Sequence, residues 1–299
     1  MSNRLEELAQ GGRLLLDGGL GQELVRRGVD TSGGLWSAQA LLTTPEIVVA
    51  AHRDFIAAGA DVITTNTYAT TRRRLEDDET FRRLNRTAAE LACRARDKSG
   101  REVLIAGSLP PIHGSYRPDR VRPLRELEPQ YREQAELLAQ HVDLFLCETL
   151  STVTEALAAA RGAAATGKPV WVSWTLADDV AAVLRSGESL ETAIAALDEV
   201  PVSALLVNCS IPESITTAMP VLAARAGRPF GGYANGFEPI RAGFDVADGR
   251  NLPRARRELD PERYADYARR WRDAGAQLLG GCCEVGPAHI ARIRETVLA

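Results

Sequence analysis

Short apolar segments alternate along this chain with longer segments in which apolar positions recur at helical spacing. The short segments are mostly continuous runs of Val, Leu and Ile without polar alternation, which is typical of parallel strands covered on both faces. We predict strands at residues 14–17, 61–65, 103–107, 143–147, 170–175, 204–208, 229–233 and 277–281.

The longer segments are predicted as helices. Residues 45–58 begin at Pro45, with Thr44 as the N-cap, and end before Gly59, since proline is favoured in a first helical turn and glycine just after the last. The other predicted helices are residues 72–98, 129–140, 152–165, 190–199, 212–226, 261–274 and 287–297.

Repeated alternation of strand and helix predicts a parallel sheet, and eight such units favour a single (β/α)8 TIM barrel over an open doubly wound sheet. No linker or internal repeat interrupts the pattern, so we expect one domain over residues 1–299. Three strand-to-helix loops are longer than a connection requires: residues 18–43, 108–128 and 234–260. Each follows the carboxyl end of a strand, where barrel enzymes carry their active sites.

Composition narrows the class of protein without naming an activity. The chain is 45% hydrophobic and 25% charged, with a net charge of −4, so it lacks the basic surplus that a nucleic-acid partner requires. No apolar run is long enough to span a bilayer, and the first ten residues lack the apolar core of a signal peptide. We therefore expect a cytoplasmic monomer or small homo-oligomer that acts on small molecules.

The chain has five cysteines, an odd number that favours free thiols or metal ligands over disulfides in a reducing compartment. Cys93 falls within a predicted helix, and Cys147 is expected to face the helices, so neither is assigned to a site. Cys282 and Cys283 follow two glycines at the end of the last predicted strand. Neighbouring residues on a strand point to opposite faces, so both thiols can reach one metal only where the backbone turns. A vicinal disulfide or a pair of core thiols are the alternatives.

Cys209 follows the sixth predicted strand and should reach the same rim of the barrel as Cys282 and Cys283. Three thiolates with no obvious fourth ligand match a catalytic zinc site, in which one coordination position stays open. The sequence therefore favours a site that accepts an exogenous ligand.

Two carboxylates are predicted at the same rim. Asp17 ends the first strand and is followed by Gly18 and Gly19, so a carboxylate and backbone N–H groups could together hold an α-amino acid. Glu148 ends the fourth strand. A simple turn and an ordinary surface acid are the respective alternatives. Trp36, in the first long loop, could bind a sulfonium or quaternary ammonium group through its aromatic face, or anchor a lid.

Together these motifs resemble the homocysteine S-methyltransferase family. The resemblance covers nearly the whole chain in the expected order, and the divided three-cysteine pattern is its most specific part. The motifs are Asp17-Gly18-Gly19, Asn208-Cys209 and Gly280-Gly281-Cys282-Cys283, supported by residues 35–38, 58–61 and 147–149.

The resemblance implies a barrel that binds one zinc ion through Cys209, Cys282 and Cys283 and transfers a methyl group to the thiolate of homocysteine, releasing methionine. No side chain is then needed as a catalytic base, because zinc removes the thiol proton. We also expect Trp36 and Thr65 in the substrate pocket. The implied contacts with homocysteine are Asp17, Gly18, Gly19, Glu148 and, less directly, Asn208.

The methyl donor is inferred from positions at which this sequence differs from the betaine-using members of the family. Betaine-using members carry further aromatic residues around the donor, and here Thr149 and Ala69 stand at the corresponding positions. This favours a sulfonium donor, S-methylmethionine first and S-adenosylmethionine second. The alternatives are betaine, a separate corrinoid methyl carrier, or a non-catalytic protein that uses its thiols for zinc storage or redox sensing.

Overall fold

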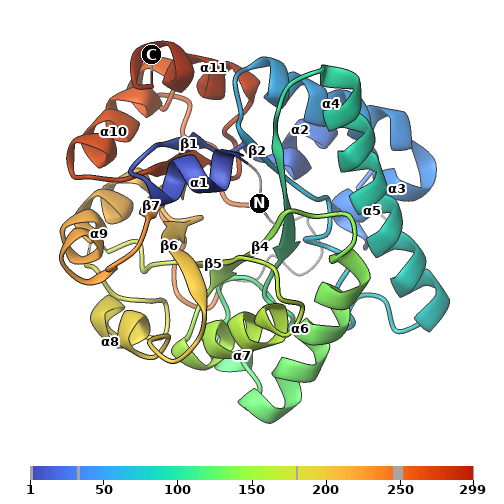
Figure 1. Cartoon of the computed structure of the whole chain (residues 1–299), viewed down its shortest axis with the longest axis horizontal. Helices are drawn as coiled ribbons and strands as arrows, with labels where there is room; N and C mark the ends of the chain where they lie inside the picture. The colour runs from blue at the N-terminus through green and yellow to red at the C-terminus, as the bar shows by residue number, and fades with distance from the viewer. Residues whose placement is uncertain (1–2, 32–33, 180, 245–251, 299) are drawn as a thin grey trace.

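The eight predicted strands form one parallel sheet that closes on itself. The computed structural model (Figure 1) describes residues 3–31, 34–179, 181–244 and 252–298. The strands pair in the order β1-β8-β7-β6-β5-β4-β3-β2, and a parallel bridge between Leu16 and Val62 joins β1 to β2. The (β/α)8 barrel is thus confirmed. The strands are β1 (Leu14–Leu15), β2 (Val62–Thr64), β3 (Leu104–Leu109), β4 (Leu144–Leu150), β5 (Val170–Trp174), β6 (Val202–Asn208), β7 (Phe230–Ala234) and β8 (Leu278–Gly281).

Helices surround this ring on the outside (Figure 1). No helix of the described residues is long and apolar enough to cross a membrane. The α-helices are α1 (Asn3–Ala9), α2 (Leu20–Arg26), α3 (Gln39–Thr43), α4 (Pro45–Ala57), α5 (Asp78–Ser99), α6 (Leu124–Leu138), α7 (Val153–Ala164), α8 (Leu190–Ala195), α9 (Pro212–Arg225), α10 (Pro261–Asp273) and α11 (Pro287–Thr296), and the 3-10 helices are η1 (Trp36–Ala38) and η2 (Pro118–Arg120).

Two predicted helix starts and one predicted N-cap were wrong, whereas the predicted start at Pro45 is confirmed. The helix predicted from residue 72 begins at Asp78, because Asp77 caps it by accepting from the Thr80 N–H at 2.7 Å. The helix α6 begins at Leu124 and carries Pro129 inside it. Thr44 precedes α4, yet its side chain makes no capping hydrogen bond.

Successive strand residues alternate between the barrel interior and the layer beneath the helices. Towards the amino-terminal ends of the strands the barrel interior is apolar, and Trp171 lies there fully buried among leucine side chains. Continuing the alternation to the carboxyl ends brings polar residues to the inward positions. These are Thr64, Ser108, Glu148, Asn208 and Tyr233, and all but Asn208 line one pocket.

Asp61, which precedes β2, is tied into the other end of the barrel. Its carboxylate accepts from the Leu15 N–H at 3.0 Å and pairs with Arg294 of α11, and Arg4 of α1 lies 3.6 Å away. One buried acid therefore joins the first two strands to the first and last helices.

Candidate metal centre and substrate pocket

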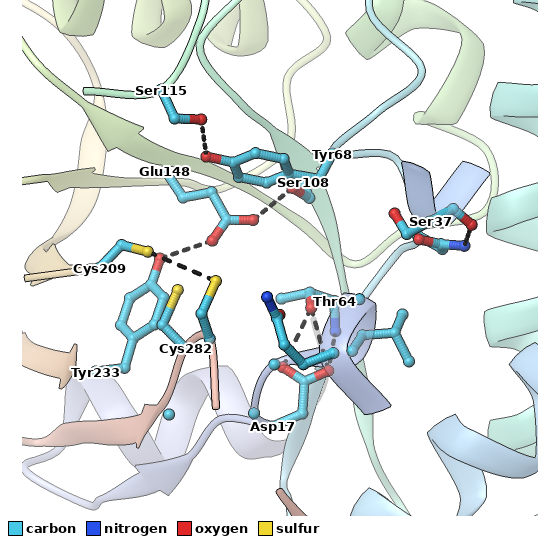
Figure 2. A pocket seen from close by; sticks show the side chains of 18 of the residues that line it. Asp17, Ser37, Thr64, Tyr68, Ser108, Ser115, Glu148, Cys209, Tyr233 and Cys282 are labelled. Carbon is cyan, nitrogen blue, oxygen red and sulfur yellow. Dashed lines mark hydrogen bonds between the residues drawn. The ribbon is translucent and has the colours of Figure 1, made fainter. Parts of the chain in front are cut away.

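The predicted site residues meet in one pocket at the carboxyl ends of the strands. Figure 2 shows Cys209 and Cys282 on one side, Glu148 above them, and Asp17 with Thr64 between the cysteines and Ser37. Asn208 is fully buried and does not line this pocket. The pocket-lining residues that the sequence predicted are Asp17, Gly18, Gly19, Trp36, Thr65, Glu148, Cys209, Cys282 and Cys283.

The three cysteines form a compact donor set. Their sulfurs all lie within 4.8 Å of one another, and those of Cys209 and Cys283 are 4.0 Å apart. Tetrahedral zinc with bonds of about 2.3 Å places its sulfur ligands about 3.8 Å apart, so the cluster fits this ion in both chemistry and size. Cys93 and Cys147 lie elsewhere, in α5 and facing the helices from β4.

Backbone conformation aims Cys209 at the pocket. Strand alternation places Asn208 inward and would turn Cys209 outward. Cys209 instead has a φ of +49°, in the left-handed region, and this turn brings its thiol to Cys282 and Cys283. A non-glycine residue in this region is uncommon, so the surrounding structure must hold Cys209 in this conformation.

A tyrosine braces the Cys209 thiol. The Tyr116 hydroxyl lies 2.9 Å from the Cys209 sulfur, and Arg185 stacks 4.6 Å above the Tyr116 ring. Arg185 forms a buried ion pair with Asp178 at 2.8 Å. Hydrogen bonds from Cys282 and Cys283, and then from Tyr116, hold the pKa of the Cys209 thiol well below its usual range.

Asn208 orders the wall behind the pocket. Its Oδ1 accepts from the Thr149 N–H and the Ser173 hydroxyl, each at 2.8 Å, and its Nδ2 donates to the Thr149 hydroxyl and faces the Cys282 sulfur at 4.0 Å. Because both polar atoms of the Asn208 amide already have partners, Asn208 can position Thr149 and Cys282 but has no polar atom left for a substrate.

The two glycines after Asp17 let the first strand approach the turn that carries the paired cysteines. A Cβ at Gly18 would lie 2.1 Å from the Val285 carbonyl oxygen, and one at Gly19 would lie 2.6 Å from that of Cys282. The Gly19 N–H donates to the Val285 carbonyl at 2.9 Å. Among the described residues, no backbone acceptor bonds to the Gly18 N–H. Of the two predicted backbone donors, the Gly18 N–H is therefore the one that could bind a ligand carboxylate.

Asp17 and Glu148 are buried acids without a cation partner among the described residues. Asp17 accepts from the Thr64 N–H and hydroxyl, and burial raises its pKa to about 8. Glu148 accepts from the Ser108 and Tyr233 hydroxyls, and burial raises its pKa to about 7. Two buried carboxyl groups without a counter-charge are suited to hold an incoming ammonium group.

Several pocket residues were missed from the sequence. Thr64, Ser108 and Tyr233 could have been found by continuing the strand alternation through each strand end. Tyr116 carried no such signal, because it lies in a loop and has a φ of +62°.

Known proteins share this chain's sequence and fold over nearly its full length. The family model described as homocysteine S-methyltransferase matches residues 14–297. Homocysteine S-methyltransferase from Escherichia coli strain K12 is 33% identical over 300 residues, which cover 94% of this chain and 94% of that protein. Selenocysteine Se-methyltransferase from Brassica oleracea var. italica is 30% identical over 325 residues, covering 97% of this chain and 90% of that protein.

Solved structures give the same result. The metallated form of the homocysteine methyltransferase MmuM from Escherichia coli matches with a TM-score of 0.79 at 30% identity, covering 95% of this chain and 96% of that one. Its oxidised form matches with a TM-score of 0.83 at 29% identity, covering 98% and 99%.

Proposed function

The chain belongs to the homocysteine S-methyltransferase family, and we propose that it transfers a methyl group from a sulfonium donor to the sulfur of L-homocysteine, forming methionine. The observation that carries this proposal is one pocket that holds both a three-thiol cluster and two buried acids for which the described residues supply no cation partner. Metal storage alone would need the thiols and not the acids.

The residues divide between the two ends of homocysteine. Asp17 and Glu148 would hold its ammonium group, and the Gly18 N–H its carboxylate. Cys209, Cys282 and Cys283 would hold Zn²⁺, which when bound keeps a thiol ligand deprotonated at neutral pH. Holding both ends fixes the acceptor sulfur in the pocket, and such positioning contributes several kcal/mol to catalysis.

The aromatic residues would receive the donor. Trp36 and Tyr68 both line the pocket, and their rings meet edge to face with centroids 6.0 Å apart. Aromatic faces attract a sulfonium cation. On transfer, the bond between the donor sulfur and its methyl carbon breaks, the acceptor sulfur forms the new bond, and the donor leaves as a neutral sulfide. S-Methylmethionine is the first candidate donor and S-adenosylmethionine the second.

The test combines metal analysis with a donor and acceptor panel. Protein purified under reducing conditions without chelator is expected to hold about one zinc per chain and to form methionine from homocysteine and S-methylmethionine. Selenocysteine is included as an acceptor because one relative carries that name. Protein that takes up no zinc and transfers no methyl group from a sulfonium, betaine or a methylated corrinoid carrier would contradict the proposal.

A further inference from the structure

One wall of the pocket carries buried polar atoms that no described residue satisfies. Both polar atoms of the Gln22 side-chain amide lack a hydrogen-bond partner, and so do the Trp36 Nε1 and the Ser37 hydroxyl. Gln22 is 4% exposed and Ser37 is 1% exposed, and all three residues line the pocket. A buried polar group left without a partner destabilises the folded protein, so several in one wall indicate a ligand that completes them.

This wall lies away from the cysteines. Figure 2 shows Ser37 on the opposite side of the pocket from Cys209 and Cys282, with Asp17 and Thr64 between them. Trp36 and Ser37 are consecutive in η1, and the Trp36 ring packs against α2 so closely that a Cβ at Gly21 would lie 2.5 Å from it. Gln22 follows Gly21, so α2 and η1 together present the three side chains.

The unsatisfied atoms of Gln22, Trp36 and Ser37 determine which chemical groups this wall could bind. The indole N–H, the Ser37 hydroxyl and the Gln22 amide nitrogen are donors, which suit a carboxylate. The Gln22 amide oxygen is an acceptor, which suits an ammonium group. Arg74 also lines the pocket and donates to the Gly34 carbonyl, and it adds a positive charge that favours a carboxylate.

We propose that Gln22, Trp36 and Ser37 form a subsite for the α-amino-acid end of the methyl donor. This inference rests on the proposed function and deepens it, because it commits the donor to a sulfonium that carries both a carboxylate and an ammonium group. Gln22 is the residue that distinguishes such a donor from one with a carboxylate alone.

Three sulfonium donors with different far ends test the subsite. S-Methylmethionine has both groups, dimethylsulfoniopropionate has the carboxylate alone, and trimethylsulfonium has neither. Wild-type kcat/KM is expected to fall at least tenfold at each step. Gln22→Met is expected to raise the KM for S-methylmethionine at least tenfold and to change that for trimethylsulfonium less than twofold, with the KM for homocysteine unchanged.

Two controls separate this role from a structural one. Gln140→Met makes the same change at an exposed position after α6 and is expected to match wild type throughout. Gln22→Met removes an unsatisfied buried amide, so its Tm is expected to equal or exceed that of wild type. Equal losses with all three donors, or a loss confined to homocysteine, would overturn the subsite.

Calorimetry distinguishes failure of the subsite from failure of the proposed function. S-Methylmethionine is titrated into wild type, Gln22→Met and Gln140→Met, each with and without 2-aminobutyrate, which has the amino-acid end of homocysteine but no thiol to methylate. Binding that weakens at least tenfold only in Gln22→Met supports the subsite even if no methyl group is transferred. Absence of binding to wild type in both conditions would overturn it, whatever the activity with other donors.

Discussion

Two buried aspartates at opposite ends of the barrel have opposite surroundings. Asp61 pairs with Arg294, has Arg4 nearby and accepts a backbone N–H from β1. Asp17 is just as buried, yet it has hydroxyl and N–H partners from Thr64 and no cation among the described residues. The first carboxylate is neutralised by the fold, whereas the second is left to be neutralised by a ligand.

The same contrast extends to the rest of each end. The Asp61 end joins helices and strands through ion pairs. The Asp17 end also contains an ion pair, between Arg185 and Asp178, but among the described residues Asp17 and Glu148 have no cation partner there. It also holds free thiols and positive φ at Thr149, Cys209 and Glu284. In a barrel of this kind, stability is concentrated at one end and chemistry at the other. Within this pocket, the acids and polar atoms that the described residues leave uncompensated indicate where a substrate would supply a partner.

The largest expected effect is on the thiol cluster. Cys209→Ser replaces one of three thiols that would hold zinc, and we expect zinc content to fall and methyl transfer to drop by about 100-fold or more. Elemental analysis and initial rates measure both effects. Cys93→Ser, in α5, is the matched control and should match wild type. Full activity of Cys209→Ser would contradict the division between the two ends.

Asp61→Asn tests the other end. It removes the charge that Arg294 faces, and we expect the free energy of unfolding to fall by about 2–4 kcal/mol, discounted because Arg294 is 31% exposed. Urea unfolding gives the change. The KM values of the folded fraction should stay at wild-type levels, and a raised KM for homocysteine with full stability would break the comparison.

Asp17→Asn is expected to raise KM and leave stability nearly unchanged, the reverse of Asp61→Asn. Its burial raises the pKa to about 8, so the charged form is disfavoured in the folded protein, and a neutral amide should alter stability by less than about 1 kcal/mol. The KM for homocysteine should rise about 30-fold, because the ammonium group loses a counter-charge. Steady-state kinetics at saturating donor measures this, and the idea fails if KM is unchanged.

His52, buried in α4, gives a pH test that depends on neither end. Burial lowers its pKa from 6.5 to about 4, and neither ring nitrogen has a partner among the described residues. Because the folded pKa is depressed, the stability that His52 contributes is present above pH 6.5 and is lost as pH falls towards 4. At pH 5.5 the loss is about 1.4 kcal/mol. His52→Leu should flatten this part of the stability profile in chemical unfolding.

Tyr116→Phe is the smallest change. It removes the hydroxyl that contacts Cys209 but keeps the ring beneath Arg185, so we expect kcat to fall about fivefold, since one hydrogen bond to sulfur is worth about 1 kcal/mol. The KM for homocysteine and the zinc content measured at equilibrium should change little. Tyr116→Leu also loses the stacking with Arg185, and its Tm should fall where that of Tyr116→Phe does not.

The sequence predicted the strands well for a physical reason. Strands covered on both faces need continuous apolar runs, and most of the eight show one. The signal was weakest for β1, which has two residues, and for β7 and β8, which contain paired glycines. The three-cysteine cluster followed once the strand ends were known, because parallel strands bring their carboxyl ends to one rim. Cys209, Cys282 and Cys283 could therefore be grouped from their places in the chain alone.

The errors arose where tertiary contacts override local pattern. Residues 72–77 continue the charge pattern of α5, yet Arg72 is held by Glu133 of α6 and the helix begins after the Asp77 cap. Tyr116 reaches Cys209 only because of its left-handed backbone and of Arg185, which comes from a distant loop. Neither contact is encoded by nearby residues, so neither could be inferred from spacing.

The pairing of β1 with β8 also determines when the pocket can assemble during synthesis of the chain. Gly18 and Gly19 leave the ribosome well before the Cys282–Cys283 turn against which they pack, because more than 260 residues separate them in the chain. At roughly 5–20 residues per second, the synthesis of Cys282 and Cys283 follows that of Gly18 and Gly19 by many seconds. A nascent chain can expose Cys209 but cannot offer three thiols together. The three thiols could therefore hold a metal together only after β8 has docked beside β1.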